Sequence, residues 1–189
     1  MYLFFDTETT GLPLNWNAPV TELANWPRLV QIAWLLYDNS GHLFAGADYI
    51  IKPKDFTIPL NASDIHGITQ ERACREGIPL ANVLAEFARS LNESETVIAH
   101  NIKFDEAIVG AEFLRLNMPN PFPSKEKICT MLKSTNLCRL EGPYGYKWPK
   151  LSELHYFLFR CDFPEAHNAA VDITATAKCF WELKQRGIV

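Results

Sequence analysis

The sequence predicts an α/β protein whose sheet contains an antiparallel portion. Three strand-like segments come first, and amphipathic helical segments follow them. Residues 1–11 begin with an apolar run that ends in two acids, and residues 28–37 and 42–52 are separated by the turn-forming residues 38–41. Two strands joined by a short turn are typical of a hairpin. Strands in a row followed by helices indicate an α/β arrangement.

The segment between the first two strands is long for a connection. Residues 12–27 carry three prolines and show no regular period. Trp16, Leu23 and Trp26 need surfaces to pack on, so we expect an ordered loop here and not a flexible linker.

Helices and two further strands follow the hairpin. Apolar residues recur at intervals of three and four within residues 79–91 and 104–117, which is the stripe of a helix that packs on one face. Short buried strands are expected at residues 96–99 and 127–130. The remaining helices are expected at residues 62–67, from Thr69 onward, at 149–159 and at 168–185. No repeat or domain boundary is visible, so residues 1–189 are expected to form one domain.

The composition excludes several classes of protein. With 189 residues, of which 48% are hydrophobic and 21% charged, the chain is typical of one globular domain. Its five cysteines are widely spaced and odd in number, which indicates reduced thiols. No segment approaches the length of a membrane span and no basic leader precedes the first strand, so we expect a cytoplasmic protein without a membrane partner.

The charge balance gives no broad positive surface for a nucleic acid duplex. Lysine and arginine number 18 and aspartate and glutamate 22, which gives a net charge of -4. If four acids are set aside for metals, the remaining charges balance. Any nucleic acid is therefore expected to be held locally, at a strand end and through cations.

Two acids end the first strand-like segment. Because side chains alternate across a strand, Asp6 and Glu8 point to the same face. Two like charges that project together from a buried strand are costly unless a proton or a cation offsets them. Asp6 and Glu8 are therefore candidates for half of a metal site. The alternative is that the strand ends at Phe5 and the acids belong to a solvated turn.

A third acid follows the short strand at residues 96–99. Asp105 falls in the first turn of the next helix, at the carboxyl edge of the expected sheet, where the ligands of open α/β sheets collect. The alternative is that Asp105 only complements the positive end of the helix dipole.

A histidine and a fourth acid stand at the start of the final helix. Residues five apart on an α-helix lie about 140° from each other, so His167 and Asp172 cannot share a face if both are helical. We infer that Asp172 is on the helix and that His167 lies on the loop before it. A loop histidine free to swing over a pocket suits a general base, and a surface histidine without a function is the alternative.

Together these segments resemble the DEDDh 3′-5′ exonucleases, the group that contains the proofreading subunit of bacterial DNA polymerase III, within the ribonuclease H-like fold. The matching segments, in the order of the family, are Phe5–Gly11, His100–Asp105 and His167–Asp172, and His66–Thr69 is similar to its small His-Gly-Ile-Thr signature. The resemblance spans residues 2–184. It implies a mixed five-stranded sheet flanked by helices, with the first three strands antiparallel and the last two parallel to the first.

The resemblance also implies hydrolysis of phosphodiester bonds with two Mg²⁺ or Mn²⁺ ions as cofactors. Two such ions, about 3.5 to 4 Å apart, activate the water and stabilise the phosphate and the departing oxygen, and Mg²⁺ prefers carboxylate and water oxygens. By resemblance, Asp6 bridges both ions, and Glu8 and Asp172 complete the ion nearer the attacking water. Asp105 acts on the other ion, often through water, and His167 takes the proton from the nucleophile.

Contacts with the substrate are implied for six further residues. They are Thr9, Thr10, Gly11, His66, Asn101 and Phe104. The backbone after Glu8 is expected to meet the terminal nucleotide, with Gly11 allowing close approach. Structural alternatives stay open, because Phe104 can belong to the core, His66 can cap a helix end and Asn101 can cap the start of the next helix.

Two segments bear on how a strand of nucleic acid would be held. Residues 139–150 mix cations with aromatic side chains, as single-strand stacking platforms do, although a turn whose rings pack on a neighbouring loop is an equal alternative. The family resemblance suggests a phosphate contact at Lys150. The loop at residues 12–27 departs from many relatives, which reach their second strand sooner, so Trp16 or Trp26 can narrow or extend the groove.

The leading expectation is a metal-dependent 3′-5′ exonuclease that acts on single-stranded or frayed DNA. The alternative within the same chemistry is an exoribonuclease of the oligoribonuclease or tRNA-trimming type, because the contact that reads a 2′-hydroxyl cannot be placed. A catalytically inactive nucleic-acid-binding module of a polymerase or repair complex is the third alternative, against which all four acids and the histidine argue. Because the chain ends at Val189, just past the last helix, we expect a stand-alone enzyme or one that associates weakly with a polymerase.

Overall fold

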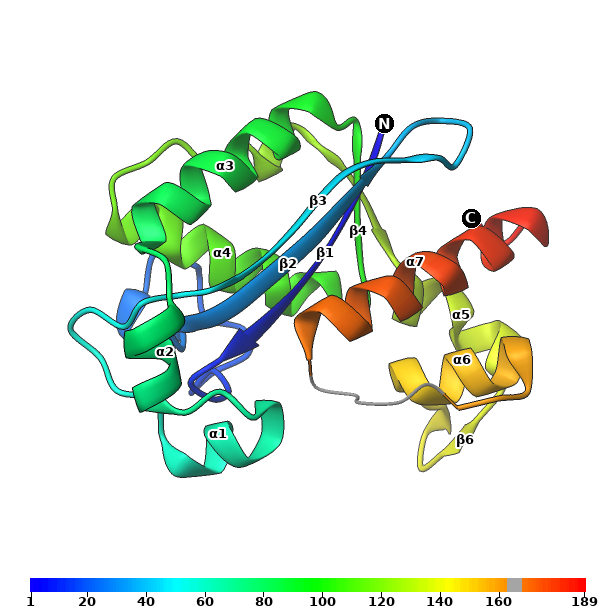
Figure 1. Ribbon diagram of the computed structural model, residues 1–189. Helices are drawn as coiled ribbons and strands as arrows, with labels where there is room; N and C mark the ends of the chain where they lie inside the picture. The colour runs from blue at the N-terminus through cyan, green and yellow to red at the C-terminus, as the bar shows by residue number, and fades with distance from the viewer. Residues whose placement is uncertain (163–167) are drawn as a thin grey trace.

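The computed structural model describes residues 1–162 and 168–189, which fold around one mixed sheet (Figure 1). The sheet has five strands in the order β3-β2-β1-β4-β5. They are β1 (Tyr2–Thr9), β2 (Leu29–Tyr37), β3 (Leu43–Ile50), β4 (Thr96–Ala99) and β5 (Glu126–Cys129). β2 is antiparallel to both β1 and β3, whereas β4 runs parallel to both β1 and β5. The predicted sheet is therefore confirmed.

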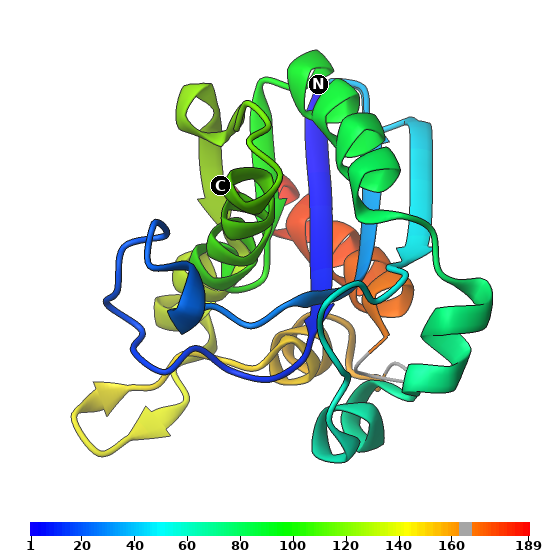
Figure 2. The ribbon, with the colours of Figure 1, turned by 90° about the vertical axis from the view of Figure 1, so that its left-hand side faces the viewer.

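Helices cover both faces of the sheet. They are α1 (Leu60–His66), α2 (Gln70–Glu76), α3 (Leu80–Glu93), α4 (Ile102–Arg115), α5 (Thr130–Cys138), α6 (Leu151–Phe159) and α7 (Ala169–Gln185). α3 and α4 lie on one face, and α7 packs against β1 and β2 on the other (Figures 1 and 2). α5 and α6 pack beside α7, and the small hairpin of β6 (Glu141–Gly142) and β7 (Gly145–Tyr146) projects from this side, yellow in Figure 2.

Strand β1 is buried on both faces, as its apolar run predicts. Leu3, Phe4 and Phe5 have no exposed surface. The ring of Phe4 lies 5.2 Å from that of Phe180 on α7, whereas the ring of Phe5 lies 5.6 Å from that of Phe87 on α3. Even-numbered residues of β1 therefore face α7, and odd-numbered residues face α3 and α4. This alternation decides which helices the acids at the end of the strand meet.

The helix signals of the sequence are confirmed, with small shifts at the ends. α1 is closed by Gly67, whose φ of 72° is left-handed, and Thr69 caps α2 by accepting a hydrogen bond from the backbone N–H of Arg72. The helix predicted at residues 104–117 begins and ends two residues earlier, because its start is fixed by the turn at Asn101 and not by the apolar stripe.

The loop at residues 12–27 is ordered. Trp26 is buried and its indole Nε1 donates to the carbonyl of Pro19 at 3.1 Å. Leu23 lies in a short 3-10 helix, Leu23–Asn25, and packs against the core. Arg115, at the end of α4, donates to the carbonyls of Leu23 and Trp26 at 2.6 and 2.7 Å. The loop is thus bound to α4 by hydrogen bonds as well as by apolar contacts.

All five cysteines lie in the described residues and are free thiols, as their spacing predicts. Among the helices that the structure describes, none combines the length and the apolar character that spanning a membrane requires.

Candidate active site

The two acids of β1 face α7. Asp6 and Glu8 are even-numbered like Phe4, so the alternation of the strand turns both carboxylates toward that helix. Asp172 lies in the first turn of α7. Asp6, Glu8 and Asp172 each offer one carboxylate oxygen, and these oxygens lie within 4.8 Å of one another. Because β1 continues to Thr9, the alternative of a strand that ends at Phe5 is wrong.

Asp105 approaches the same strand end from the opposite face of the sheet. Thr7 is odd-numbered and faces α4, and its hydroxyl donates to Oδ1 of Asp105 at 2.7 Å. Asp105 is in the first turn of α4 and only 3% exposed. An acid that merely complements a helix dipole has no need of such burial, so the structure places Asp105 with the acids of β1 and not in solvent.

The acids at this strand end raise one another's pKa. Removal from water raises the pKa of Asp6 well above its ordinary value, and the neighbouring charges, led by that of Asp105, raise it further. Burial, with the charges of Asp172 and Asp105, raises the pKa of Glu8 to about 8. Burial also raises the pKa of Asp105 to about 7, although the hydrogen bond from Thr7 acts in the opposite direction.

The carboxylates suit divalent cations. Within residues 1–162 and 168–189, Asp6, Glu8 and Asp105 form no salt bridge with a lysine or an arginine. Carboxylate oxygens are the ligands that Mg²⁺ and Mn²⁺ prefer, and a bound cation would remove the repulsion that raises the pKa values. The chemistry of the donor groups and their uncompensated charge therefore fit a divalent-metal site.

The predicted histidine lies outside the described residues, so the role of His167 stays a prediction. The next residue, Asn168, caps α7 by accepting a hydrogen bond from the backbone N–H of Ala170 at 3.1 Å. The backbone N–H of Ala169 donates to the side chain of Gln31 on β2 at 3.4 Å. The start of the helix that carries Asp172 is thus fixed against the sheet.

The register of β1 against β2 shifts after Glu8, and the chain leaves the sheet after Thr9. The hydroxyl of Thr9 donates to the carbonyl of Gly11 at 2.6 Å, and Thr10 exchanges hydrogen bonds with the backbone of Arg28. Gly11 has a φ of 148°, which favours glycine, and no heavy atom of the described residues lies within 4 Å of the place of a Cβ. Gly11 therefore leaves open space beside the strand end, as close approach by a substrate requires.

The three other predicted substrate residues lie around the same strand end but differ in their surroundings. His66 ends α1, is 7% exposed and accepts the backbone N–H of Ile68 at Nδ1, as a helix-terminal residue would. Burial lowers its pKa, partly offset by the backbone of Thr9. Asn101 stands at the N-cap position of α4 with a φ of 75°, but its side chain makes no capping hydrogen bond, so that alternative is wrong. Phe104 is half-buried and packs against the core.

His100 is a residue of this edge that the sequence analysis did not single out. Its Nε2 lies 2.9 Å from the carbonyl oxygen of Pro149, and its Nδ1 lies 2.9 Å from the hydroxyl of Thr130. Burial lowers its pKa to about 4, so the ring is neutral, with Nε2 donating and Nδ1 accepting. His100 thus joins the end of β4 to α5 and to the chain before α6. The sequence signal that could have identified His100 is its position directly before Asn101, a predicted substrate residue.

The sequence matches a known family over nearly its whole length. A family model described as exonuclease, RNase T, matches residues 3–180. The chain belongs to the RNase T exonuclease family. These are DEDD 3′-5′ exonucleases of the ribonuclease H-like superfamily and depend on divalent metals, so the prediction of an exonuclease is confirmed. None of the curated proteins matches the sequence.

Solved structures of exonuclease I share the fold of this exonuclease. E. coli exonuclease I in complex with a dT13 oligonucleotide is 20% identical with a TM-score of 0.77, over 98% of this chain and 41% of that chain. The zinc-bound form of an E. coli exonuclease I complex with single-stranded DNA is 22% identical with a TM-score of 0.74, and so is exonuclease I from Methylocaldum szegediense; each match covers 98% of this chain and 40% of the other. The chain thus spans about two-fifths of the length of these structures.

Proposed function

We propose that this exonuclease removes nucleotides from the 3′ end of single-stranded or frayed DNA, with two Mg²⁺ or Mn²⁺ ions and with His167 as the general base. The observation that carries the proposal is the meeting of Asp6, Glu8 and Asp172 within 4.8 Å, beside the buried Asp105. Three separate elements bring these groups to the carboxyl end of β1, the edge at which α/β sheets bind ligands. Residues 1–189 act in this proposal as one exonuclease domain.

The acids would divide between the two ions. Asp6, Glu8 and Asp172 would hold the ion near the attacking water, and Asp105 would serve the second ion, which Asp6 shares. Bound there, the cations would lower the pKa of the water and neutralise charge on the phosphate and on the departing 3′ oxygen. Four carboxylates balance two dications, so the occupied site is formally neutral before the phosphate arrives.

The remaining residues would orient the substrate and move one proton. His167 would accept the proton of the attacking water, since a histidine changes charge near neutral pH. Thr7 would hold the Asp105 carboxylate in place through its hydrogen bond. The backbone at Thr9, Thr10 and Gly11 would meet the terminal nucleotide in the space that Gly11 leaves open. His66, Asn101 and Phe104 would complete the pocket for this nucleotide.

Single-stranded DNA is the substrate that the similar structures favour. E. coli exonuclease I has been solved with dT13 and with dA16 oligonucleotides, although those chains are more than twice as long as this one. The likeness to the polymerase III proofreading subunit, a weak polymerase association and a cytoplasmic location stay predictions from the sequence.

The test is an exonuclease assay on matched substrates. Single-stranded DNA and RNA of equal sequence, labelled at the 5′ end, are incubated with Mg²⁺ or Mn²⁺. The expected result is a ladder that shortens from the 3′ side of DNA. Asp6→Ala should slow it by about 10³-fold or more, and His167→Ala by roughly 10²- to 10⁴-fold. Glu95→Gln is the matched control and should leave the rate unchanged. It alters an exposed acid that lies 3.5 Å from the amino group of Met1.

Two other results would replace the proposal. Faster shortening of RNA than of DNA would assign the chain to the exoribonucleases. No turnover of either polymer with any divalent ion would favour a nucleic-acid-binding module without catalysis.

A further inference from the structure

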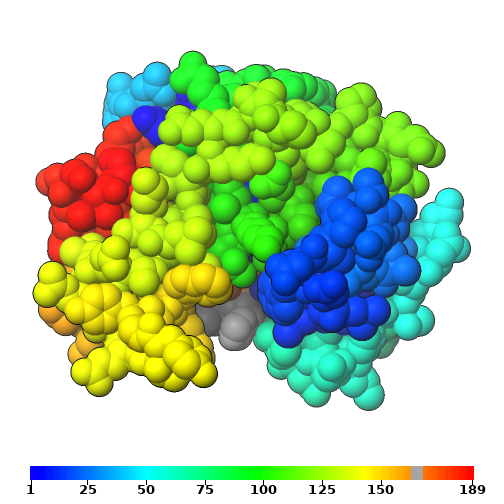
Figure 3. Space-filling model, turned by 180° about the vertical axis from the view of Figure 1, so that it is seen from behind, coloured from blue at the N-terminus to red at the C-terminus, as the bar shows by residue number. Residues whose placement is uncertain are grey.

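Two exposed tryptophans flank the start of α4, the helix that carries Asp105. Trp16, from the loop at residues 12–27, is 44% exposed and packs on Phe104 with ring centroids 5.7 Å apart. Trp148, which follows the β6–β7 hairpin, is 64% exposed. Figure 3 shows the surface hollowed between these two segments, blue and yellow, with the green β4–α4 region above the hollow. The hollow therefore opens beside the helix start that presents Asp105.

The backbone on the Trp148 side is fixed although its ring is exposed. Pro149 is buried, and its carbonyl receives the hydrogen bond of His100, the last residue before the turn into α4. The backbone N–H of Lys147 donates to the carbonyl of Leu140 at 2.9 Å, which closes the base of the hairpin. Trp148 lies between these two anchors. Its position beside the end of β4 is thus set before any ligand binds.

The backbone on the Trp16 side is fixed as well. Arg115 holds the loop at two carbonyls, and Asn25 accepts the backbone N–H of Asn15 at 2.7 Å. A hollow of about 330 Å³ separates the loop from α4 and is lined by Trp16 and, on α4, by Lys103. Lys103 is exposed and forms no salt bridge within the part of the chain that the structure describes. A cation thus lies beside the Trp16 hollow, two residues before Asp105 on the same helix.

These features fit a strand of nucleic acid better than a folded protein surface. The rings are separate, each on its own anchored segment, and Tyr144 and Tyr146 continue the exposed aromatic surface along the hairpin. Separate flat rings with a cation beside one of them match unpaired bases linked by phosphates. Lys103, which lines the hollow beside Trp16, lies in the same first turn of α4 as Asp105, where the 3′ end would arrive.

We propose that Trp16 and Trp148 are two base-stacking positions on opposite sides of an entry groove, and that Lys103 contacts a phosphate beside Trp16. The occupant is the single strand on the 5′ side of the nucleotide being cleaved, bound without preference for base sequence. The inference rests on the proposed function, because it places the 3′ end of this strand at the acids. It explains why a chain with no broad positive surface can hold a polynucleotide.

The test measures binding separately from cleavage. Oligothymidylates of three and twelve nucleotides, with a 5′ fluorophore and a 3′ phosphorothioate linkage, are titrated in Ca²⁺ and followed by fluorescence anisotropy. The wild-type protein should bind the longer strand at least about tenfold more tightly. Trp16→Leu keeps apolar contact with Phe104, and Trp148→Ala removes an exposed ring. Each should weaken binding of the longer strand about tenfold, and together they should abolish the effect of length.

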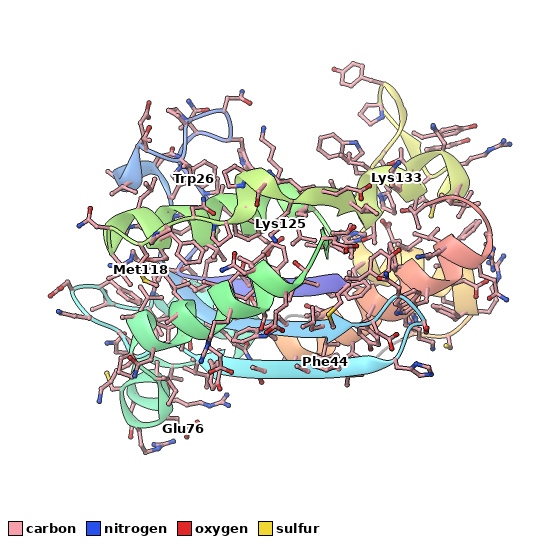
Figure 4. The ribbon with its side chains drawn as sticks, turned by 90° about the horizontal axis from the view of Figure 1, so that it is seen from above. Trp26, Phe44, Glu76, Met118, Lys125 and Lys133 are labelled. Carbon is pink, nitrogen blue, oxygen red and sulfur yellow. The ribbon has the colours of Figure 1, made fainter. Side chains whose placement is uncertain are left out.

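Phe44→Ala is the matched control. Phe44 is an exposed ring on the edge strand β3, on the far side of the sheet from the hairpin (Figure 4). Its removal should change neither affinity, and unfolding curves should show that all variants fold. Unchanged binding of the longer strand in both tryptophan variants, or equal weakening by Phe44→Ala, would overturn the inference.

Failure of the proposed function is distinguishable from failure of this inference. Hydrolysis of the p-nitrophenyl ester of thymidine 5′-monophosphate in Mn²⁺ reports the acids without requiring a groove. If the ester is cleaved but binding does not depend on oligonucleotide length, the groove alone is overturned. The two rings would then form a surface for a protein partner. Absence of both binding and ester cleavage overturns the groove and the nuclease assignment together.

Discussion

Glu112 and the acids at the end of β1 differ in the charges that surround their carboxylates. Glu112, on α4, is fully buried, and its Oε1 accepts from Arg28 Nε at 2.9 Å and from the backbone N–H of Leu29 at 3.0 Å. Arg115 brings a second guanidinium within 3.0 Å of the same oxygen. This acid is matched by positive charge from the protein itself.

Asp6, Glu8 and Asp105 have no such match among the residues that the structure describes. Asp105 lies on the same helix as Glu112 and is almost as deeply buried, yet its hydrogen bond comes from the neutral hydroxyl of Thr7. Burial alone therefore does not distinguish the two sets. Glu112 is paired with two arginines and stabilises the fold, whereas the acids that we propose as metal ligands raise one another's pKa.

The largest expected effect comes from removing the negative charge of Glu112, which pairs with Arg28 and Arg115. Glu112→Gln keeps the shape of the side chain but leaves Arg28 and Arg115 without the charge that they surround. The free energy of unfolding should fall by about 3 kcal/mol, and Tm by roughly 6 to 12 °C for a chain of this length. Urea and thermal unfolding followed by circular dichroism measure both.

A control on the same helix sharpens the result. Glu106 pairs with Lys127 at 2.7 Å on the surface, so Glu106→Gln should cost less than about 1 kcal/mol. Equal losses in the two variants would contradict the conclusion that the buried ion pairs of Glu112 stabilise the fold more than a surface pair does.

The raised pKa values of Glu8 and Asp105 should make the stability of the folded protein depend on pH. The pKa of Glu8 is raised to about 8 and that of Asp105 to about 7, so the folded protein keeps protons that the unfolded chain has released. The free energy of unfolding of the metal-free protein should therefore fall by on the order of 2 kcal/mol between about pH 6.5 and 8.5. The range begins there because burial lowers the pKa of His66 and His100. These two histidines reduce the free energy of unfolding only below about pH 6.5, where the unfolded chain binds protons that the folded protein does not.

The measurement is a series of thermal unfolding curves in EDTA across this pH range. Addition of Mn²⁺ at the alkaline end should restore the lost stability, because the cation relieves the repulsion. Asp6→Asn, which removes one charge from the cluster, should flatten the fall. A wild-type stability that does not change with pH would show that the acids are compensated in some other way.

The smallest expected effect concerns how Asp105 is held. Thr7→Val keeps the shape of the side chain and removes the hydroxyl that donates to Asp105. Loss of a hydrogen bond to a charged group, about 1.5 kcal/mol, corresponds to roughly a tenfold fall in kcat. Because that bond lowers the pKa of Asp105, the acid limb of the pH-rate profile should move to higher pH. Steady-state kinetics against pH measure both changes, and the exposed Thr57→Val is the control that should alter neither.

What the sequence predicted correctly depends on local rules. Asp6 and Glu8 were expected on one face because side chains alternate along a strand, and the structure has them there with Asp172. Gly67 and Thr69 were identified as helix ends because a left-handed residue and a capping hydroxyl act over a few residues. Predictions from such local rules hold in the folded protein because they depend on no distant contact.

What the sequence did not predict depends on distant partners. Glu112 looks like a solvated acid of a helix, because Arg28, which pairs with it, lies on another element. β6 and β7 have two residues each, too few to show a period, so their hairpin was seen only as an aromatic segment. Residues 139–150 and Trp16 were each considered as substrate contacts, but their approach to the start of α4 from two different loops depends on contacts with Phe104 and His100 that no local rule reveals.

The placement of Asp172 has a consequence for biosynthesis. A nascent chain that has emerged as far as α6 already contains Asp6, Glu8 and Asp105, but the three-carboxylate cluster forms only when α7 docks on β1. No local segment of the chain can assemble the cluster, so it is completed only by the tertiary folding of the last helix.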